Sequence, residues 1–91
     1  STEARYKESV ALARKVDTIL VIGGGISANT ARLTQLCRQV QPRTFQIEDA
    51  EDIEIPWLER GKTIGITAGA STPDWLVEDI REKLLSKFVT R

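Results

Sequence analysis

The sequence has 91 residues, enough for one domain with one core, and its 13 basic and 13 acidic side chains leave no formal net charge. This balance provides no general attraction to nucleic acid or to an anionic membrane, so we expect neither as a partner. The chain has one cysteine, Cys37, and no histidine. These counts exclude an internal disulfide, a metal cluster held by cysteines of this chain alone, and a histidine-based catalytic triad.

The sequence also lacks the signals of membrane insertion and export. No apolar run approaches the roughly 20 residues of a membrane span. No basic and then apolar signal segment opens the sequence. We therefore expect a cytoplasmic protein.

A helix is predicted at the beginning, from about Glu3 to Arg14. Ser1 and Thr2 can cap it, and apolar residues follow at helical spacing. These residues are Val10, Leu12, Ala13 and Val16. Because a helix usually follows a strand in an alternating α/β protein, this order suggests that the sequence belongs to something longer.

The central stretch runs from an apolar segment through three glycines into small polar residues. Ile19–Ile22 are continuous and mostly β-branched, which is typical of a strand covered on both faces. Gly23–Gly25 allow a sharp turn, and a helix is predicted from about Ala28 to Val40. Free N–H groups at the start of that helix favour an anion beside the glycines.

A second strand and an acidic connection follow. Thr44–Ile47 has the composition of a short strand. The acidic run Glu48–Glu54 is interpreted as a solvated, structural connection rather than an anion site, because its carboxylates repel phosphate. Gly61 is predicted to mark the turn that leaves this connection.

A third strand and a last helix complete the chain. The strand is predicted at Thr63–Thr67. Thr72 and Pro73 then open a helix, with Pro73 at its first position and Asp74 in its first turn, and the helix continues to about Lys87.

This order of elements predicts an α/β fold, a three-layer sandwich in which a small parallel sheet with strand order 2-1-3 has helices on both faces. We expect residues 1–91 to form a single domain. Ligands of such sheets bind outside the carboxyl ends of the strands, where the strand order reverses. The loops Gly23–Asn29 and Thr67–Thr72 should therefore line one crevice.

The glycine turn also fits a dinucleotide-binding pattern. Gly23-x-Gly25-x-x-Ala28 has the required spacing, and Glu48 follows at about the distance of an acid that meets a ribose hydroxyl. A glycine-rich turn of another use is the favoured interpretation in so short a chain. No lysine follows the glycines as a P-loop requires, so nucleotide hydrolysis is not expected.

Other residues have simple structural interpretations. Ser71 and Thr72 either cap the last helix or contribute to the crevice: composition alone favours capping, and the similar chemistry of the two neighbouring loops leaves both interpretations open. Cys37 is predicted to be a small core residue. Trp57 and Trp75 are predicted to cover a small core rather than to act as stacking platforms.

Taken together, four segments resemble the 4-hydroxy-3-methylbut-2-enyl diphosphate reductases of non-mevalonate isoprenoid synthesis, also called IspH or LytB. The last of them is the most specific, and the likeness covers nearly the whole chain in register. The segments are Val16–Gly24, Ser27–Leu33, Ile47–Ile53 and Gly65–Pro73, the last reading Gly-Ile-Thr-Ala-Gly-Ala-Ser-Thr-Pro.

The resemblance implies that this chain is the carboxyl-terminal lobe of a larger enzyme, in which three α/β lobes surround a 4Fe–4S cluster. In that family a Ser-Ser-Asn-Ser stretch and the serine of Thr-Ala-Gly-Ala-Ser bind the substrate diphosphate. By position these are Ser27, Ala28, Asn29, Thr30 and Ser71. Ala28 departs from the pattern and removes one hydroxyl donor.

Two further departures are visible. Gly25 and Ile26 replace a pair that is usually polar in the family. Arg5 matches the arginine of a family Arg-Gln pair, whereas Tyr6 replaces its glutamine. The family's cluster cysteines, its histidines and its proton-delivering glutamate have no counterpart here, so the chain alone should be inactive, with no catalytic residue and no bound cofactor.

The implied partners are hydroxymethylbutenyl diphosphate, the remaining lobes of the parent protein, and an electron donor such as ferredoxin or flavodoxin. The parent would be an iron–sulfur oxidoreductase that makes isopentenyl and dimethylallyl diphosphates. The alternatives are a stand-alone nucleotide-binding or interaction module that uses the glycine-rich turn, and a homologue altered at Ala28 that has lost activity.

Overall fold

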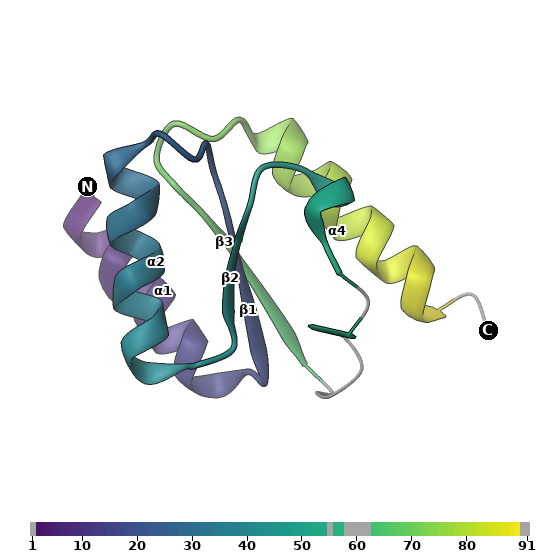
Figure 1. Ribbon diagram of the computed structural model, residues 1–91, viewed down its shortest axis with the longest axis horizontal. Coiled ribbons are helices and arrows are strands. Elements are labelled where there is room, and N and C mark those ends of the chain that lie inside the picture. The colour runs from purple at the N-terminus through teal and green to yellow at the C-terminus, as the bar shows by residue number, and fades with distance from the viewer. Residues whose placement is uncertain (1, 55, 58–62, 90–91) are drawn as a thin grey trace.

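The computed structural model describes residues 2–54, 56–57 and 63–89. In chain order (Figure 1) its elements are α1 (Thr2–Lys15), β1 (Thr18–Ile22), α2 (Ala28–Val40), β2 (Thr44–Ile47), the short 3-10 helix η1 (Ala50–Asp52), β3 (Ile64–Ala68) and α4 (Asp74–Val89). The predicted turn at Gly61 lies outside the described residues. No helix within the described ranges is long and apolar enough to cross a bilayer.

The three strands form one parallel sheet in the order β2-β1-β3, as predicted. β1 lies in the centre, where Ile19 is opposite Thr44 of β2 and Gly65 of β3. Parallel neighbours require crossovers, and α2 provides the one between β1 and β2. The carboxyl ends of β1 and β3 therefore meet at one edge of the sheet, together with the loops that follow them.

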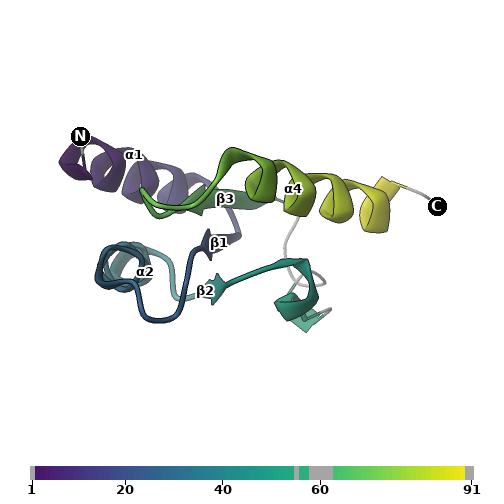
Figure 2. The same ribbon diagram turned by 90° about the horizontal axis from the view of Figure 1, so that it is seen from above.

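The sheet separates two layers of helix. Figure 2 shows α1 and α2 on one side of the strands and α4 with η1 on the other. Ile19 and Val21 of β1 pack with Cys37 and other residues of α1 and α2, whereas Leu20 and Ile22 pack with residues that include Ile80 and Leu84 of α4. All five residues of β1 are buried, which confirms the prediction of a strand covered on both faces.

The ends of β3 and α4 differ slightly from the prediction. β3 runs one residue later, because Thr63 is held before the strand by Asp17: its N–H donates to Asp17 Oδ2 at 3.3 Å, and its Oγ1 accepts from Asp17 N–H at 3.1 Å. α4 begins at Asp74 and ends at Val89. Pro73 directly precedes it, and its carbonyl accepts from Leu76 N–H at 3.2 Å in a tighter first turn.

The acidic connection has a structural role, as predicted, although the short helix η1 within it is not predicted. Asp49 caps η1 by accepting from Glu51 N–H at 2.9 Å, and Asp52 accepts from Glu48 N–H at 2.8 Å. These carboxylates satisfy backbone donors that a short helix would otherwise leave free.

The two tryptophans behave differently. Trp57 is half-buried and stacks on Phe45, with ring centroids 4.1 Å apart and planes inclined by 5°, and it packs against the core as predicted. The prediction for Trp75 is wrong, because its side chain is 69% exposed. It directly follows Asp74 at the start of α4, whereas the buried face of this helix is formed by Ile80 and Leu84.

Candidate functional site

The loops that follow β1 and β3 are joined at the carboxyl end of β1. We call residues 23–27 the first loop and residues 69–73 the second loop. Both Gly69 N–H and the Thr72 hydroxyl donate to the Ile22 carbonyl at 3.0 Å. The Thr72 hydroxyl thus bonds to the end of β1 and does not cap α4. The two loops converge, as the topology predicted.

Asn29 links the start of α2 to the second loop. Its Oδ1 accepts a hydrogen bond from Ala70 N–H at 3.0 Å, and its Nδ2 donates to the Tyr6 hydroxyl of α1 at 3.1 Å. An amide group has two N–H donors, so one remains without a partner among the described residues. Tyr6, which stands where the resembling family has glutamine, therefore orients Asn29.

Thr30 lies between Gly23 of the first loop and Gly69 of the second loop. It is fully buried, and its Oγ1 has no hydrogen-bond partner among the described residues. A Cβ added at Gly23 or at Gly69 would overlap its side chain. Glycine is required at both positions because Thr30 is packed against the backbone, and no pattern in the sequence signals this contact. Its buried hydroxyl points between these glycines.

The first turn of α2 provides the donors that an anion would need. Ser27 is the N-cap, and its Oγ accepts from Thr30 N–H at 3.2 Å, which leaves the hydroxyl hydrogen to donate elsewhere. In the part of the chain that the structure describes, the N–H groups of Ala28 and Asn29 make no hydrogen bond. Ala28 is exposed and adds no side-chain donor.

Glu48 lies closer to the first loop than expected of a solvated connection. It is exposed, yet its Oε2 accepts from Gly25 N–H at 2.8 Å. The acid that follows β2 in the dinucleotide pattern therefore contacts the glycine turn itself. Sequence spacing indicated this proximity, and the structure shows that a backbone donor already holds the carboxylate.

A cavity of about 430 Å³ opens between the two loops. Its size is in the range of small-ligand sites. Its lining combines glycine backbone, hydroxyl groups and one carboxylate, with the fully exposed Ile26 among its residues. It is lined by Gly23, Gly24, Gly25, Ile26, Glu48, Ser71, Thr72, Pro73 and Leu76. Of the five positions that the resemblance assigns to binding, Ser71 lies in this lining, whereas Ser27, Ala28, Asn29 and Thr30 lie at the adjoining start of α2.

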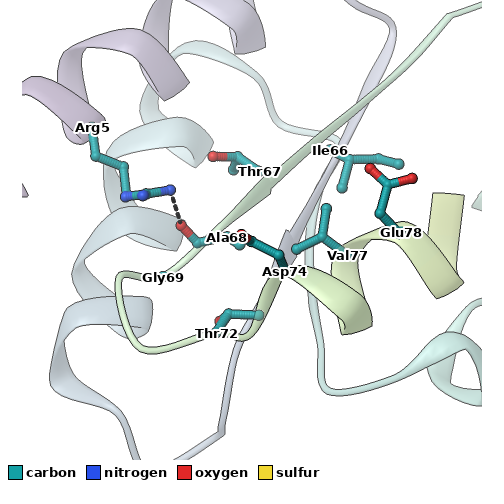
Figure 3. Close-up of a pocket in the computed structure, with 9 residues that line it drawn as sticks. All are labelled: Arg5, Ile66, Thr67, Ala68, Gly69, Thr72, Asp74, Val77 and Glu78. Carbon is teal, nitrogen blue, oxygen red and sulfur yellow. Dashed lines mark hydrogen bonds between the residues drawn. The ribbon is translucent and has the colours of Figure 1, made fainter.

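A second hollow of about 370 Å³ lies along β3, between α1 and α4 (Figure 3). Arg5 reaches it from α1 and donates through Nη1 to the Ala68 carbonyl at 3.2 Å. Asp74 and Glu78 line it from α4. Gly69 and Thr72 line it too, so this hollow adjoins the second loop. The positively charged side chain of Arg5 therefore lies beside the second loop.

The described residues do not fit an iron–sulfur cluster. They include no group of three His, Cys, Asp or Glu side chains that could hold a metal ion. Cys37 is fully buried in the core between α1, α2 and the sheet, as predicted. Desolvation by burial raises the pKa of its thiol, which disfavours the thiolate that metals require.

Together the parallel sheet and the two loops at the ends of β1 and β3 define a doubly wound α/β domain with its candidate site at the switch point of the strands. The chain belongs to the LytB protein family, which matches residues 1–85. This family is the one that the sequence resembles.

Similar proteins carry the name of the reductases that the sequence resembles. The chain is 50% identical over 84 residues to the 4-hydroxy-3-methylbut-2-enyl diphosphate reductase of Geobacter metallireducens and 46% identical to that of Geobacter sulfurreducens. Each alignment covers 92% of this chain and 30% of the relative. The chain thus spans about a third of the length of the relatives it matches.

The chain is also similar in fold to solved structures of such reductases. A structure of (E)-4-hydroxy-3-methyl-but-2-enyl diphosphate reductase, described as the terminal enzyme of the non-mevalonate pathway, matches with a TM-score of 0.90 and 39% identity. The match covers 93% of this chain and 30% of that one. The corresponding reductase of Plasmodium falciparum shares the fold, with a TM-score of 0.80 at 23% identity.

Proposed function

We propose that the two loops bind the diphosphate group of hydroxymethylbutenyl diphosphate, within a longer protein that reductively removes the substrate hydroxyl. The products would be isopentenyl and dimethylallyl diphosphates. This chain would be the carboxyl-terminal lobe and would contribute binding rather than redox chemistry. The redox step would use a 4Fe–4S cluster held by residues outside this chain.

The observation that carries this proposal is the link between Asn29 and Ala70, which brings the two loops together. Around it lie donors suited to phosphate: the hydroxyls of Ser27 and Ser71, and the free N–H groups at the start of α2. Hydrogen bonds to charged oxygens are stronger than neutral ones, and the α2 dipole adds a positive field at the same place. Membership in the LytB family supports the same ligand.

A second candidate function is favoured by Glu48. Its position beside Gly25 is compatible with a nucleotide whose ribose hydroxyl would donate to the carboxylate. In that case the chain would be a nucleotide-binding module that uses the glycine-rich turn. The two candidates differ in what they require of Glu48, since a ribose would engage it and a diphosphate would not.

Titration of the isotope-labelled 91-residue chain, followed by amide NMR shifts, distinguishes them. Pyrophosphate should shift the amides of residues 25–30 and 70–72, with weak, about millimolar affinity, which corresponds to about 4 kcal/mol. NADH is the competing probe. Saturable NADH shifts that include Glu48 and Asp49, with none from pyrophosphate, would overturn the diphosphate proposal.

The remaining partners follow from the proposed parent reaction. A reductive dehydroxylation needs an electron donor, for which ferredoxin or flavodoxin are the proposed classes. The other lobes of the parent would close the site from the solvent. We also propose that the protein is located in the cytoplasm.

A further inference from the structure

Glu48 lines the cavity between the two loops and is hydrogen-bonded to the first loop. Its Oε2 lies 2.8 Å from the backbone nitrogen of Gly25, and the same side chain lines the cavity together with Ser71. The cavity therefore contains one negative charge before any ligand enters. The N–H group of Gly25 in the first loop is already hydrogen-bonded to this carboxylate.

The contact between Glu48 and Gly25 consists of a single hydrogen bond from an exposed side chain. Glu48 is exposed, and within the described residues its carboxylate makes this one hydrogen bond. Its backbone is fixed separately, because its N–H donates to Asp52 Oδ2 at 2.8 Å. The side chain can consequently leave Gly25 without disturbing η1 or the end of β2.

We propose that Glu48 is an internal competitor for the anion, whose carboxylate holds Gly25 N–H in the free site and is displaced when a phosphate group binds. This inference rests on the proposed function and adds how that site is regulated. Carboxylate and phosphate are both acceptors, so they cannot share one N–H donor, and their like charges repel at close range. Glu48 thus lowers the affinity for anions and keeps the glycine turn ordered in their absence.

The opposite role for Glu48 makes the opposite prediction. If the carboxylate only fixed the turn in its binding conformation, removing it would weaken binding. Glu51 provides a matched control, because it is an exposed acid of the same connection that does not line the cavity between the loops. Glu48→Gln and Glu51→Gln change the net charge equally.

The test is a pyrophosphate titration of the 91-residue chain and these variants by amide NMR. Glu48→Gln should bind roughly tenfold more tightly than the wild type, in the range of one charge contact near a surface, and Glu51→Gln should differ less than twofold. Glu48→Ala, which removes the acceptor as well as the charge, should also bind more tightly. Added salt should shrink the difference between Glu48→Gln and wild type. In the wild type, saturating pyrophosphate should move the Glu48 side-chain carboxyl signal together with the Gly25 amide.

Equal or weaker binding by Glu48→Gln would overturn the competitor role and leave the proposed function standing. An equal gain in Glu48→Gln and Glu51→Gln would also overturn it, because net charge alone would then explain the effect. Absence of pyrophosphate binding in every folded variant would overturn the proposed function itself, and the competitor role with it.

Discussion

The Asn29 side-chain oxygen accepts a hydrogen bond from the Ala70 backbone N–H at 3.0 Å, although 41 positions separate the two residues. The same amide group donates to Tyr6 at 3.1 Å. One side chain therefore connects α1, the start of α2 and the second loop. This arrangement fixes the spacing of the two loops, so a ligand bound as proposed would meet loops that are already ordered, at a lower entropic cost.

The first prediction concerns this connection. Asn29→Ala should lower the free energy of unfolding by about 1–2 kcal/mol, because two side-chain hydrogen bonds are lost and Ala70 N–H must bond to water. Tyr6→Phe removes one of these bonds and should cost about 0.5–1 kcal/mol. Urea denaturation measures both values. An equal loss in the two variants would show that the bond to Ala70 contributes nothing to stability.

A second prediction follows from the packing of Thr30 against the glycines. Gly69→Ala should destabilise the fold by about 1–3 kcal/mol, since the new Cβ would overlap the Thr30 side chain. Gly24→Ala is the control, because a Cβ there has open space and no described glycine has positive φ. Combining Gly69→Ala with Thr30→Ala should recover part of the loss in a double-mutant cycle. Additive effects would mean that the two positions do not interact.

The Thr30 hydroxyl itself gives a third prediction. It is buried without a partner among the described residues, a state that costs stability. Thr30→Val keeps the shape of the side chain and removes the hydroxyl, so it should leave stability unchanged or raise it by up to about 2 kcal/mol. Thermal unfolding tests this. A loss of stability in Thr30→Val would show that the hydroxyl is hydrogen-bonded in solution.

The strands were predictable because each one carries a clear local pattern, and their order followed from the right-handed crossovers that join parallel strands. Ile19–Ile22 is apolar and mostly β-branched, and α2 matches its predicted limits of Ala28–Val40 because Ser27 caps it and Pro42 follows its end. Trp75 was misplaced because apolar character alone does not reveal which face of a helix is buried. The neighbours of α4 decide that, and they lie far away in the sequence.

The convergence of the two loops was predictable, whereas the contacts within the candidate site were less so. Spacing indicated the two loops, whereas the partners of Asn29 depend on α1 and the second loop meeting in space. Glu48 was correctly placed at the end of β2, but its bond to Gly25 depends on the distance between neighbouring strands and on the side-chain rotamer. Neither quantity is encoded in a local pattern.

Burial of Cys37 gives a fourth prediction. Because desolvation raises the pKa of its thiol, the folded state binds this proton more tightly than the unfolded state. Its contribution to stability is complete below the unfolded thiol pKa of about 8.5 and is lost as the pH rises from there toward the folded pKa. Cys37→Ala should therefore lose stability less steeply than the wild type across this alkaline range. Parallel curves of unfolding free energy against pH would contradict the assignment.

The last prediction restores the hydroxyl that Ala28 lacks. Ala28 is exposed at the first position of α2, next to the N-cap Ser27, and its own N–H is free within the described part of the chain. A serine there would place a hydroxyl beside the donors that are proposed to hold phosphate. Ala28→Ser should tighten pyrophosphate binding roughly 3- to 10-fold, less than a full hydrogen bond to a charged group because the side chain must be ordered.

The matched control is Ala31→Ser, the same substitution at another exposed position of α2. It should leave the affinity unchanged, since position 31 lies nearly one turn farther from the free N–H groups of the helix start. Ser71→Ala, on the other side of the cavity, should weaken binding by about 1–3 kcal/mol. Isothermal titration with pyrophosphate measures all three variants. If Ser71→Ala weakens binding while Ala28→Ser and Ala31→Ser both match the wild type, the phosphate is held by the second loop and does not reach the first turn of α2.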